Sequence, residues 1–267
     1  MKQGIFFTII IVLAAAACKK TPDFLFKAPL QNVYFDISPE DSTVYTFAYK
    51  PDLGRDTVYL PVKLAGLRAD SIRKFGVIVV DTATTARPGV HYEVFKEWYN
   101  LPADSGVFRL PVILFNTDPL LQTQSVKLTL MLKPGAGLDT NVNKLIRTKV
   151  ILSAKLEQPD WWNTWPLGAY SRTKHELFMI ATGVTSMTKE GLDAPRNLFL
   201  TGRLNVMIAD PFAWVANNPD KGYVLTQRPD GEYDFYATSN PAKKILVRKF
   251  SSSGRFYFVD ENDLDIN

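Results

Sequence analysis

In residues 107–118, VFRLPVILFNTD, every second position from Phe108 to Leu114 is apolar, which gives a two-residue period. Because successive side chains of a β-strand point to opposite faces, this period predicts a strand with one buried face. Residues 56–66, 125–137 and 147–158 repeat the pattern. The inward set predicted for the four stretches is Phe108, Leu110, Val112, Leu114, Val58, Leu60, Val62, Leu64, Val126, Leu128, Leu130, Leu132, Thr148, Val150, Leu152, Ala154 and Leu156. Half-buried strands are therefore expected to dominate residues 33–156.

Turn-forming sequences separate these strands and predict how they are arranged. Glycine, proline and aspartate gather at residues 50–56, 86–92, 101–106 and 133–139. Many short strands at this spacing are typical of a β-sandwich. The continuous apolar run at residues 75–82 favours a central strand. Pro61 and Pro111 lie inside predicted strands, and since proline donates no backbone hydrogen bond, we expect edge strands or bulges there.

The pattern changes after Gln158. Residues 171–184 have apolar side chains near helical spacing, with Ser171 as a predicted N-cap and Gly183 as a predicted stop. Residues 194–222 predict a second helix that Pro211 breaks or restarts. Residues 232–262 favour short strands or a hairpin. The chain is thus predicted to be mainly β, with a β-sandwich domain at 30–157 and a smaller α+β C-terminal region at 158–267 packed on it.

Composition supports a globular chain, and the residue pattern argues against nucleic-acid binding, serine hydrolases and zinc metalloproteases. Of the 267 residues 46% are hydrophobic, and the formal net charge is only +4. Basic residues are interspersed with acids, so nucleic-acid binding is not indicated. The two histidines, His91 and His175, are far apart, and neither a Gly-x-Ser-x-Gly motif nor a His-x-x-x-His helix occurs. We therefore expect no catalytic residues, no metal site and no cofactor.

The N-terminus predicts export and lipidation. Residues 5–17 form an apolar run of about 20 Å as a helix, which is shorter than the roughly 30 Å core of a bilayer. Ala15, Ala16 and Ala17 then precede Cys18, the single cysteine. This arrangement resembles the lipobox of bacterial lipoproteins, in which the cysteine carries fatty acyl chains such as palmitate. We predict a signal peptide at 1–17, lipidation of Cys18 and a polar tether at 18–29.

Part of the predicted sandwich resembles the Calx-β repeat, an immunoglobulin-like sandwich. The resemblance covers roughly residues 75–132 and is carried by Gly89 and Tyr92, by the turn at 102–104, and by the strand that runs into Asp118. Calx-β domains of exchangers bind calcium through several acids at that last position. Residues 116–118 read Asn-Thr-Asp, so calcium, which takes six to eight oxygen ligands, is expected to bind poorly if at all.

The whole mature chain, with residues 159–178 as its most distinctive stretch, resembles an uncharacterised lipoprotein family of Bacteroidota, domain of unknown function family 4843. Genes of that family tend to lie beside SusC/SusD-type nutrient-uptake systems, so the resemblance implies SusC/SusD-like proteins as partners. It supplies no catalytic residues. Lys19 and Lys20 follow Cys18, where surface lipoproteins of these bacteria often carry acids. The face of the outer membrane is therefore left open between periplasm and surface.

An aromatic cluster lies at the change from strand to helix: Trp161, Trp162, Trp165 and Tyr170. Aromatic rings stack on sugars and are common in binding hot spots, but they also join parts of a core. Both ligand binding and domain packing are open for the cluster, and domain packing is the favoured interpretation. On the packing alternative, Trp161 or Trp162 lies between the sandwich and the C-terminal region.

These observations lead to one expected function and two alternatives. We expect a non-catalytic cell-envelope lipoprotein, anchored to the outer membrane through Cys18, that is an accessory ligand-binding component of a SusC/SusD-type uptake system. Its ligand would be a glycan or a peptide. The first alternative is a structural scaffold of the outer membrane that contacts other proteins through exposed strand edges. An enzyme of unknown mechanism is the second.

Overall fold

The computed structural model describes residues 31–142, 144–250 and 252–267. The predicted signal peptide, Cys18 and the tether at 18–29 lie outside these residues. Within the ranges described, no helix combines the length and apolarity needed to cross a bilayer.

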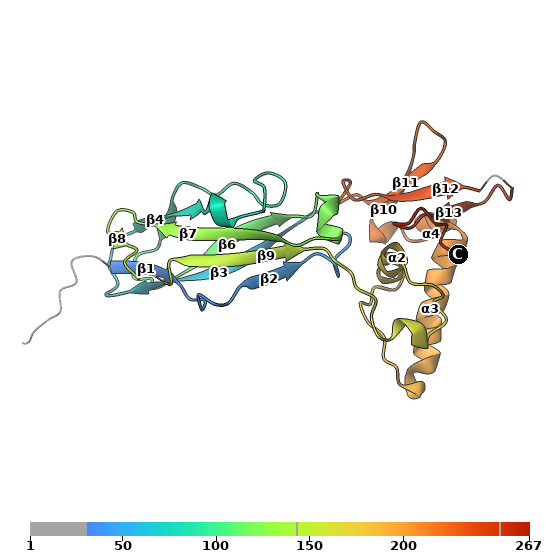
Figure 1. Ribbon diagram of the computed structural model, residues 1–267, viewed down its shortest axis with the longest axis horizontal. Coiled ribbons are helices and arrows are strands. Elements are labelled where there is room, and N and C mark those ends of the chain that lie inside the picture. Colours follow the sequence, from blue (N-terminus) through green and yellow to red (C-terminus); the bar gives the residue numbers. More distant parts are fainter. Residues whose placement is uncertain (1–30, 143, 251) are drawn as a thin grey trace, which may run out of the picture. The chain divides into compact units, whose positions relative to one another are not determined.

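Residues 31–153 form a β-sandwich of two sheets (Figure 1). The first sheet has the strand order β6-β3-β1-β8 and the second has the order β2-β9-β7-β4-β5. The strands are β1 (Gln31–Phe35), β2 (Thr43–Thr46), β3 (Arg55–Ala65), β4 (Arg73–Val79), β5 (Tyr99–Leu101), β6 (Val107–Phe115), β7 (Val126–Lys133), β8 (Leu138–Asp139) and β9 (Arg147–Ser153). Short 3-10 helices, η1 (Asp81–Ala83) and η2 (Pro119–Gln122), lie in the connections. The predicted fold class is confirmed.

The alternation read from the sequence matches the side chains buried between the sheets, with one exception: Leu156 lies beyond the end of β9 and packs in the C-terminal core, so its place in the inward set is wrong. Leu60 and Val62 of β3 and Leu110 of β6 are fully buried, as are Leu130 of β7 and Val150 of β9. These residues belong to a single hydrophobic core with contributions from both sheets. Burial of apolar surface stabilises the packing of the two sheets by about 25 cal/mol for each Å² removed from water.

The two strand prolines have different surroundings. β6 is the edge strand of its sheet, so the prediction for Pro111 is confirmed. The prediction for Pro61 is wrong, because β3 is an inner strand that pairs with β6 residue for residue and without a bulge. The Pro61 carbonyl accepts a hydrogen bond from the Asp36 amide, so the Pro61 nitrogen faces the β1 side, where the ladder ends at Phe35. Asp36 lies opposite Pro61 in this register, and because proline has no N–H with which to return the hydrogen bond, the ladder between β1 and β3 ends here.

The C-terminal part contains three helices and a separate antiparallel sheet (Figure 1). The helices are α2 (Arg172–Thr182), α3 (Ala194–Ala209) and α4 (Pro211–Asn217), with 3-10 turns η3 (Trp162–Thr164), η4 (Gly191–Asp193) and η5 (Pro219–Lys221). The strands, in sheet order, are β10 (Tyr223–Gln227), β11 (Tyr233–Ala237), β12 (Ile245–Lys249) and β13 (Phe256–Phe258). The sequence did not predict β10.

Local sequence explains where these helices begin and end. The Ser171 hydroxyl accepts a hydrogen bond from the Lys174 amide and caps α2, and Gly183 ends the helix with a φ of 76°. Pro211 separates α3 from α4, and the Asp210 carboxylate caps α4 by accepting from the Phe212 and Ala213 amides. The caps and the proline break predicted from the sequence are thus confirmed.

Candidate functional site

The predicted aromatic cluster is largely buried in the C-terminal core. Trp161 is 5% exposed and Trp162 is 0% exposed, and both belong to the core cluster that Ala48 and Leu156 join from the sandwich side. The indole N–H of Trp162 donates to the Gly168 carbonyl over 3.1 Å. These two indoles therefore have no free face on which a ligand could stack.

The other two members of the cluster are partly buried and hydrogen bonded. The Trp165 indole N–H donates to the Thr188 carbonyl at 2.8 Å, and the Tyr170 hydroxyl donates to the Leu156 carbonyl at 3.4 Å. Burial raises the pKa of Tyr170 to about 12, so its hydroxyl stays protonated. The Tyr170 bond links the start of α2 to the segment that leaves β9.

His175 of α2 lies among these rings. Its ring centroid is 5.4–5.9 Å from those of Trp161, Trp162 and Tyr170. The side chain is buried, and neither ring nitrogen has a hydrogen-bond partner among the residues that the structure describes. Burial lowers the pKa of His175 from 6.5 to about 4, because a charged imidazolium would lose its hydration there.

This burial predicts a loss of stability in mild acid. Between pH 6.5 and 4 the unfolded chain binds a proton on His175 and the folded chain does not, so the free energy of unfolding should fall as the pH decreases through this window. The contribution is about 3 kcal/mol by pH 4. Denaturant melts of the wild type and of His175→Leu across this range measure it. Between pH 6.5 and 4 the free energy of unfolding should fall by about 3 kcal/mol less in His175→Leu than in the wild type. Equal losses in the two proteins would contradict the prediction.

His91 is also buried, and both of its ring nitrogens are engaged. The Arg87 amide donates to Nδ1 at 2.8 Å, so Nε2 carries the proton and donates to Asp118 Oδ2 at 3.0 Å. Arg87 Nη2 contacts the same carboxylate oxygen at 2.7 Å. The Leu120 amide, followed by the Arg87 and His91 side chains, lowers the pKa of Asp118. This cluster fixes the loop before η2 and leaves His91 with no free nitrogen to act as a base.

The same contacts predict a weak response to calcium. The Asp118 carboxylate already contacts a guanidinium, so a cation at this position would have to displace Arg87. Within the described ranges, no group of three or more His, Cys, Asp and Glu residues is arranged to hold a metal ion. Millimolar calcium should change the melting temperature by less than about 1 °C, because a ligand stabilises a protein only by binding its native state. A rise of several degrees that a chelator reverses would restore the calcium analogy with Calx-β domains.

Hydrogen bonds join the sandwich to the turn between β11 and β12, residues 238–244, which we call the β11–β12 turn. Ser239 Oγ donates to the Asp52 carbonyl at 2.6 Å, and the buried Asn240 donates through Nδ2 to the Leu53 carbonyl at 3.3 Å. A Cβ atom on Gly54 would lie 2.9 Å from the Ser239 carbonyl oxygen, so only glycine allows this approach. The loop that precedes β3 is thereby held against the C-terminal part.

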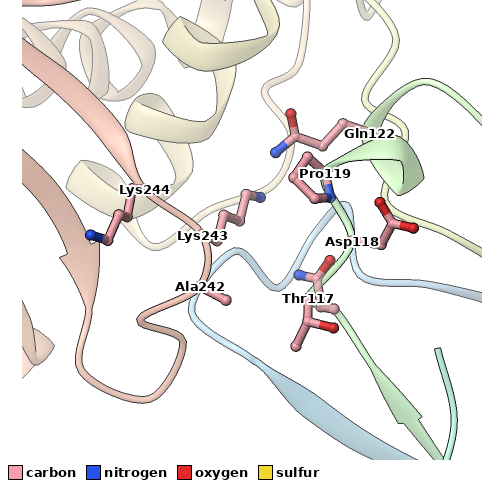
Figure 2. A pocket seen from close by; sticks show the side chains of 8 residues that line it. Thr117, Asp118, Pro119, Gln122, Ala242, Lys243 and Lys244 are labelled. Atoms are coloured by element: carbon pink, nitrogen blue, oxygen red, sulfur yellow. The ribbon is translucent and has the colours of Figure 1, made fainter. Parts of the chain in front are cut away.

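A hollow of about 200 Å³ lies beside this junction (Figure 2). Figure 2 shows Lys243 and Lys244 on one wall and the Thr117–Gln122 segment on the other. Lys243 pairs with the Glu176 carboxylate, and Lys244 Nζ lies 2.7 Å from Asp234 Oδ2. Because these lysines already have carboxylate partners, the hollow has little charge left to attract an anionic ligand.

A second groove, of about 380 Å³, is the better candidate for a binding site. We call it the Tyr49 groove. Its walls come from the loop after β2, the end of α2 and the segment around η5, and they include Tyr49, Asp52, Val184, Thr185, Asp220 and Tyr223. Tyr49 is 54% exposed, so much of its surface is open to solvent. Aromatic surface and exposed carboxylates thus lie together in one concave surface.

The polar groups of the Tyr49 groove favour ligands that donate hydrogen bonds. Burial raises the pKa of Tyr223 far above its usual value of 10, so its phenol stays neutral. Lys221 donates its ammonium to the Ile180 carbonyl at 2.8 Å, at the end of α2, and burial lowers its pKa. Asp52 and Asp220 are exposed and can accept hydrogen bonds. Sequence reasoning missed this groove, because Tyr49 and Tyr223 lie far apart in unremarked loop and strand sequence.

Comparison with solved structures finds chains of low sequence identity. The apo form of the Calx CBD1 domain is 15% identical with a TM-score of 0.35, and the match covers 46% of this chain and 96% of that domain. A candidate carbohydrate-binding protein from Bacteroides ovatus is 15% identical with a TM-score of 0.36, over 47% of this chain and 38% of that one. A Bacteroides ovatus protein of unknown function is 17% identical with a TM-score of 0.34, over 45% and 43% of the two chains. Comparison with curated proteins finds no match.

A family match covers more than half of the chain. It extends over residues 26–184, which include the whole sandwich, the aromatic cluster and α2. The resemblance inferred from the sequence is confirmed by this match. Helices α3 and α4 and the sheet β10–β13 lie beyond the matched residues. The chain belongs to the family described as domain of unknown function DUF4843.

Proposed function

We propose that this chain is a non-catalytic, lipid-anchored protein of the cell envelope that holds a ligand in the Tyr49 groove. In this role it serves as an accessory binding component of a SusC/SusD-type uptake system. The observation that carries the proposal is the exposed ring of Tyr49 beside Asp52, Asp220 and Tyr223 in one groove. The short apolar run that ends at Cys18 supports the anchor.

The groove favours binding over chemistry because it offers no activated group. The groove lining contains neither histidine nor cysteine among the described residues. His91 has both ring nitrogens engaged, and His175 is enclosed by aromatic rings. The ammonium of Lys221 is committed to the Ile180 carbonyl. General acid–base or nucleophilic catalysis needs an activated group within reach of the substrate. The two histidines do not line the groove, and its own titratable groups, Asp52, Asp220 and Lys221, have no histidine or cysteine beside them in the lining.

The ligand chemistry follows from the lining. A tyrosine ring provides a flat apolar surface for the C–H face of a sugar or for a peptide side chain. Exposed carboxylates and the Thr185 hydroxyl accept hydrogen bonds from hydroxyl or amide donors. These groups suit an uncharged glycan or a short peptide.

The test compares two tyrosines of nearly equal exposure. Tyr49 is 54% exposed in the groove, and Tyr59 is 51% exposed on β3, outside the groove lining. An array of neutral oligosaccharides and an array of peptides serve as probes for the wild type, Tyr49→Ala and Tyr59→Ala. Tyr49→Ala should weaken binding at least about tenfold, which corresponds to about 1.4 kcal/mol. Tyr59→Ala should bind like the wild type.

The lipid anchor is tested separately. Cys18→Ser should leave the precursor unprocessed and move it out of the detergent phase. Binding without any loss in Tyr49→Ala would remove the groove from the proposal, and normal membrane partitioning of Cys18→Ser would remove the anchor. Binding lost equally in the two tyrosine variants would also contradict a site at Tyr49.

A further inference from the structure

Strand β10 is an edge strand whose outward backbone groups have no hydrogen-bond partner among the described residues. It lies at one end of its sheet and pairs with β11. The Thr238 amide donates to the Gly222 carbonyl, which sets the phase of this pairing. Because hydrogen-bonded pairs alternate in an antiparallel ladder, the N–H and C=O groups of Tyr223, Leu225 and Gln227 point away from β11.

The chain covers or blocks other edges of its sheets. On the opposite edge of the same sheet, the Ile266 amide donates to the Phe258 carbonyl of β13 at 2.8 Å. Edge strand β6 contains Pro111, and the Glu93 amide donates to its Ile113 carbonyl at 2.9 Å. Strand β10 has no proline, no lysine and no bulge. Proteins block exposed edges because such edges pair readily with other chains, so the open edge of β10 indicates a partner strand.

The open edge begins at the Tyr49 groove. Tyr223 is the first residue of β10 and also lines the groove. Its side chain and that of Leu225 face the C-terminal core, whereas Gln227 at the far end of the strand is exposed. The strand spans about 17 Å at roughly 3.4 Å for each residue. A chain laid along β10 therefore reaches the groove at one of its ends.

The repeat of the outward groups defines the chemistry of the partner. The N–H and C=O groups of every second residue face outward, at a repeat of about 6.8 Å along the strand. Another extended main chain supplies acceptors and donors in the same alternation and at the same repeat. The hydroxyl groups of an oligosaccharide do not reproduce this alternation along a whole strand. The edge therefore favours a polypeptide over a glycan.

The charge of the groove adds a requirement on one side chain of the partner. The lining contains two carboxylates, Asp52 and Asp220, and one ammonium, that of Lys221, which donates to the Ile180 carbonyl. The exposed ring of Tyr49 lies in the same lining and can hold a cation over its face. The groove therefore favours a lysine or arginine side chain.

We propose that the ligand is an extended segment of another protein, which adds to β10 as a fifth strand of this sheet and places a basic side chain in the Tyr49 groove. The proposal rests on the groove as the ligand site and selects a peptide over a glycan. Main-chain hydrogen bonds to Tyr223, Leu225 and Gln227 supply affinity for the extended segment, and the groove supplies selectivity for its basic residue.

The first test removes one outward N–H from β10. An array of seven-residue peptides is the probe for the wild type, Gln227→Pro and Gln227→Ala. Because the Gln227 N–H points away from β11, proline removes it and leaves the ladder to β11 intact. Gln227→Pro should weaken peptide binding at least about tenfold. Gln227→Ala is the matched control, since it keeps the N–H, and it should bind like the wild type. Thermal melts show that each variant is folded.

The second test changes the peptide and leaves the protein unaltered. The strongest peptide of the array is synthesised with a single N-methyl group at each position in turn. Methylation should abolish binding at every second residue and be tolerated between them, because successive amides of a strand point in opposite directions. Replacing its basic residue by norleucine should weaken binding about two- to fivefold. Methylation effects without a two-residue period would overturn strand addition.

Further outcomes separate this proposal from the groove itself. Binding lost in Tyr49→Ala but kept in Gln227→Pro would overturn strand addition and leave the groove as the ligand site. Binding to oligosaccharides alone, or to no peptide of the array, would also overturn it. Peptide binding that needs no basic residue would overturn the part assigned to the groove. A wild-type chain that sediments at twice the mass of one chain, and that Gln227→Pro converts to single chains, would show that a second copy occupies the edge and would overturn the proposal.

Discussion

Truncation of Trp162 to alanine is expected to lower the free energy of unfolding by about 3–5 kcal/mol. The side chain is fully buried, and among the described residues it is the largest that is fully buried. Its ring contacts Trp161, Tyr170 and His175, with centroids 5.0–5.7 Å away. The change leaves a cavity among these rings and removes the hydrogen bond to the Gly168 carbonyl. Such a loss is a large share of the roughly 5–15 kcal/mol that stabilises a typical domain.

Denaturant melts measure this loss, and two variants control for its cause. Trp165→Ala removes a partly buried indole from the same cluster and should cost clearly less. Trp162→Phe keeps an aromatic ring and should recover much of the stability. Wild-type stability in Trp162→Ala, together with loss of ligand binding, would contradict the packing role and return the cluster to the ligand-stacking alternative.

The sandwich could be predicted because the alternation of apolar side chains is visible within each strand and recurs in several strands. Leu110, Val112 and Leu114 are buried for the same reason that they alternate in the sequence, since one face of β6 meets the core. The ends of α2 could also be predicted, because Ser171 and Gly183 form their capping hydrogen bonds with backbone groups within one helical turn. Such features depend on neighbours in the sequence, and the tertiary structure leaves them unchanged.

The wrong or missing predictions concern features that depend on contacts between segments far apart in the sequence. The prediction for Pro61 required knowing that the β1 ladder ends at Phe35, and the sequence does not contain this information. Strand β10 was missed because its alternation is short, and its pairing with β11 makes it a strand. Trp161 and Trp162 were recognised as an aromatic cluster, but their burial among residues of α2 became visible only in the structure.

The candidate site lay beyond sequence reasoning for a related reason. The Tyr49 groove brings together a loop of the sandwich, the end of α2 and the start of β10. None of its residues forms a motif with its neighbours in the sequence. The junction beside it depends on Gly54 meeting Ser239 and on the Glu176–Lys243 pair, which join segments remote in the chain. Only three-dimensional proximity gives these residues a role.

Replacement of Glu176 by alanine should destabilise the chain by about 3–5 kcal/mol. Its side chain is 5% exposed and pairs with that of Lys243, which is 10% exposed. Without Glu176, the ammonium of Lys243 stays buried without its carboxylate, and the cost of removing that charge from water is no longer offset. Because Lys243 belongs to the β11–β12 turn, hydrogen exchange in residues 238–244 should accelerate more than in the sandwich strands. Denaturant melts and exchange mass spectrometry provide the two measurements.

A double replacement separates the pair's charge from its packing. Glu176→Leu with Lys243→Met removes both charges at similar volume, so it should cost much less than Glu176→Ala, because no unpaired charge remains. The coupling between the two positions follows from the cycle of single and double variants. If Glu176→Ala and the double variant lose the same stability, packing alone explains the effect. If Glu176→Ala unfolds like the wild type, the pair is solvated and does not hold the β11–β12 turn against α2. A large loss of stability in Glu176→Ala that the double variant mostly recovers would show that the buried charge pair fixes the β11–β12 turn. The same turn holds Ser239 and Asn240 against the loop that carries Asp52 into the Tyr49 groove, so the pair would also support the groove.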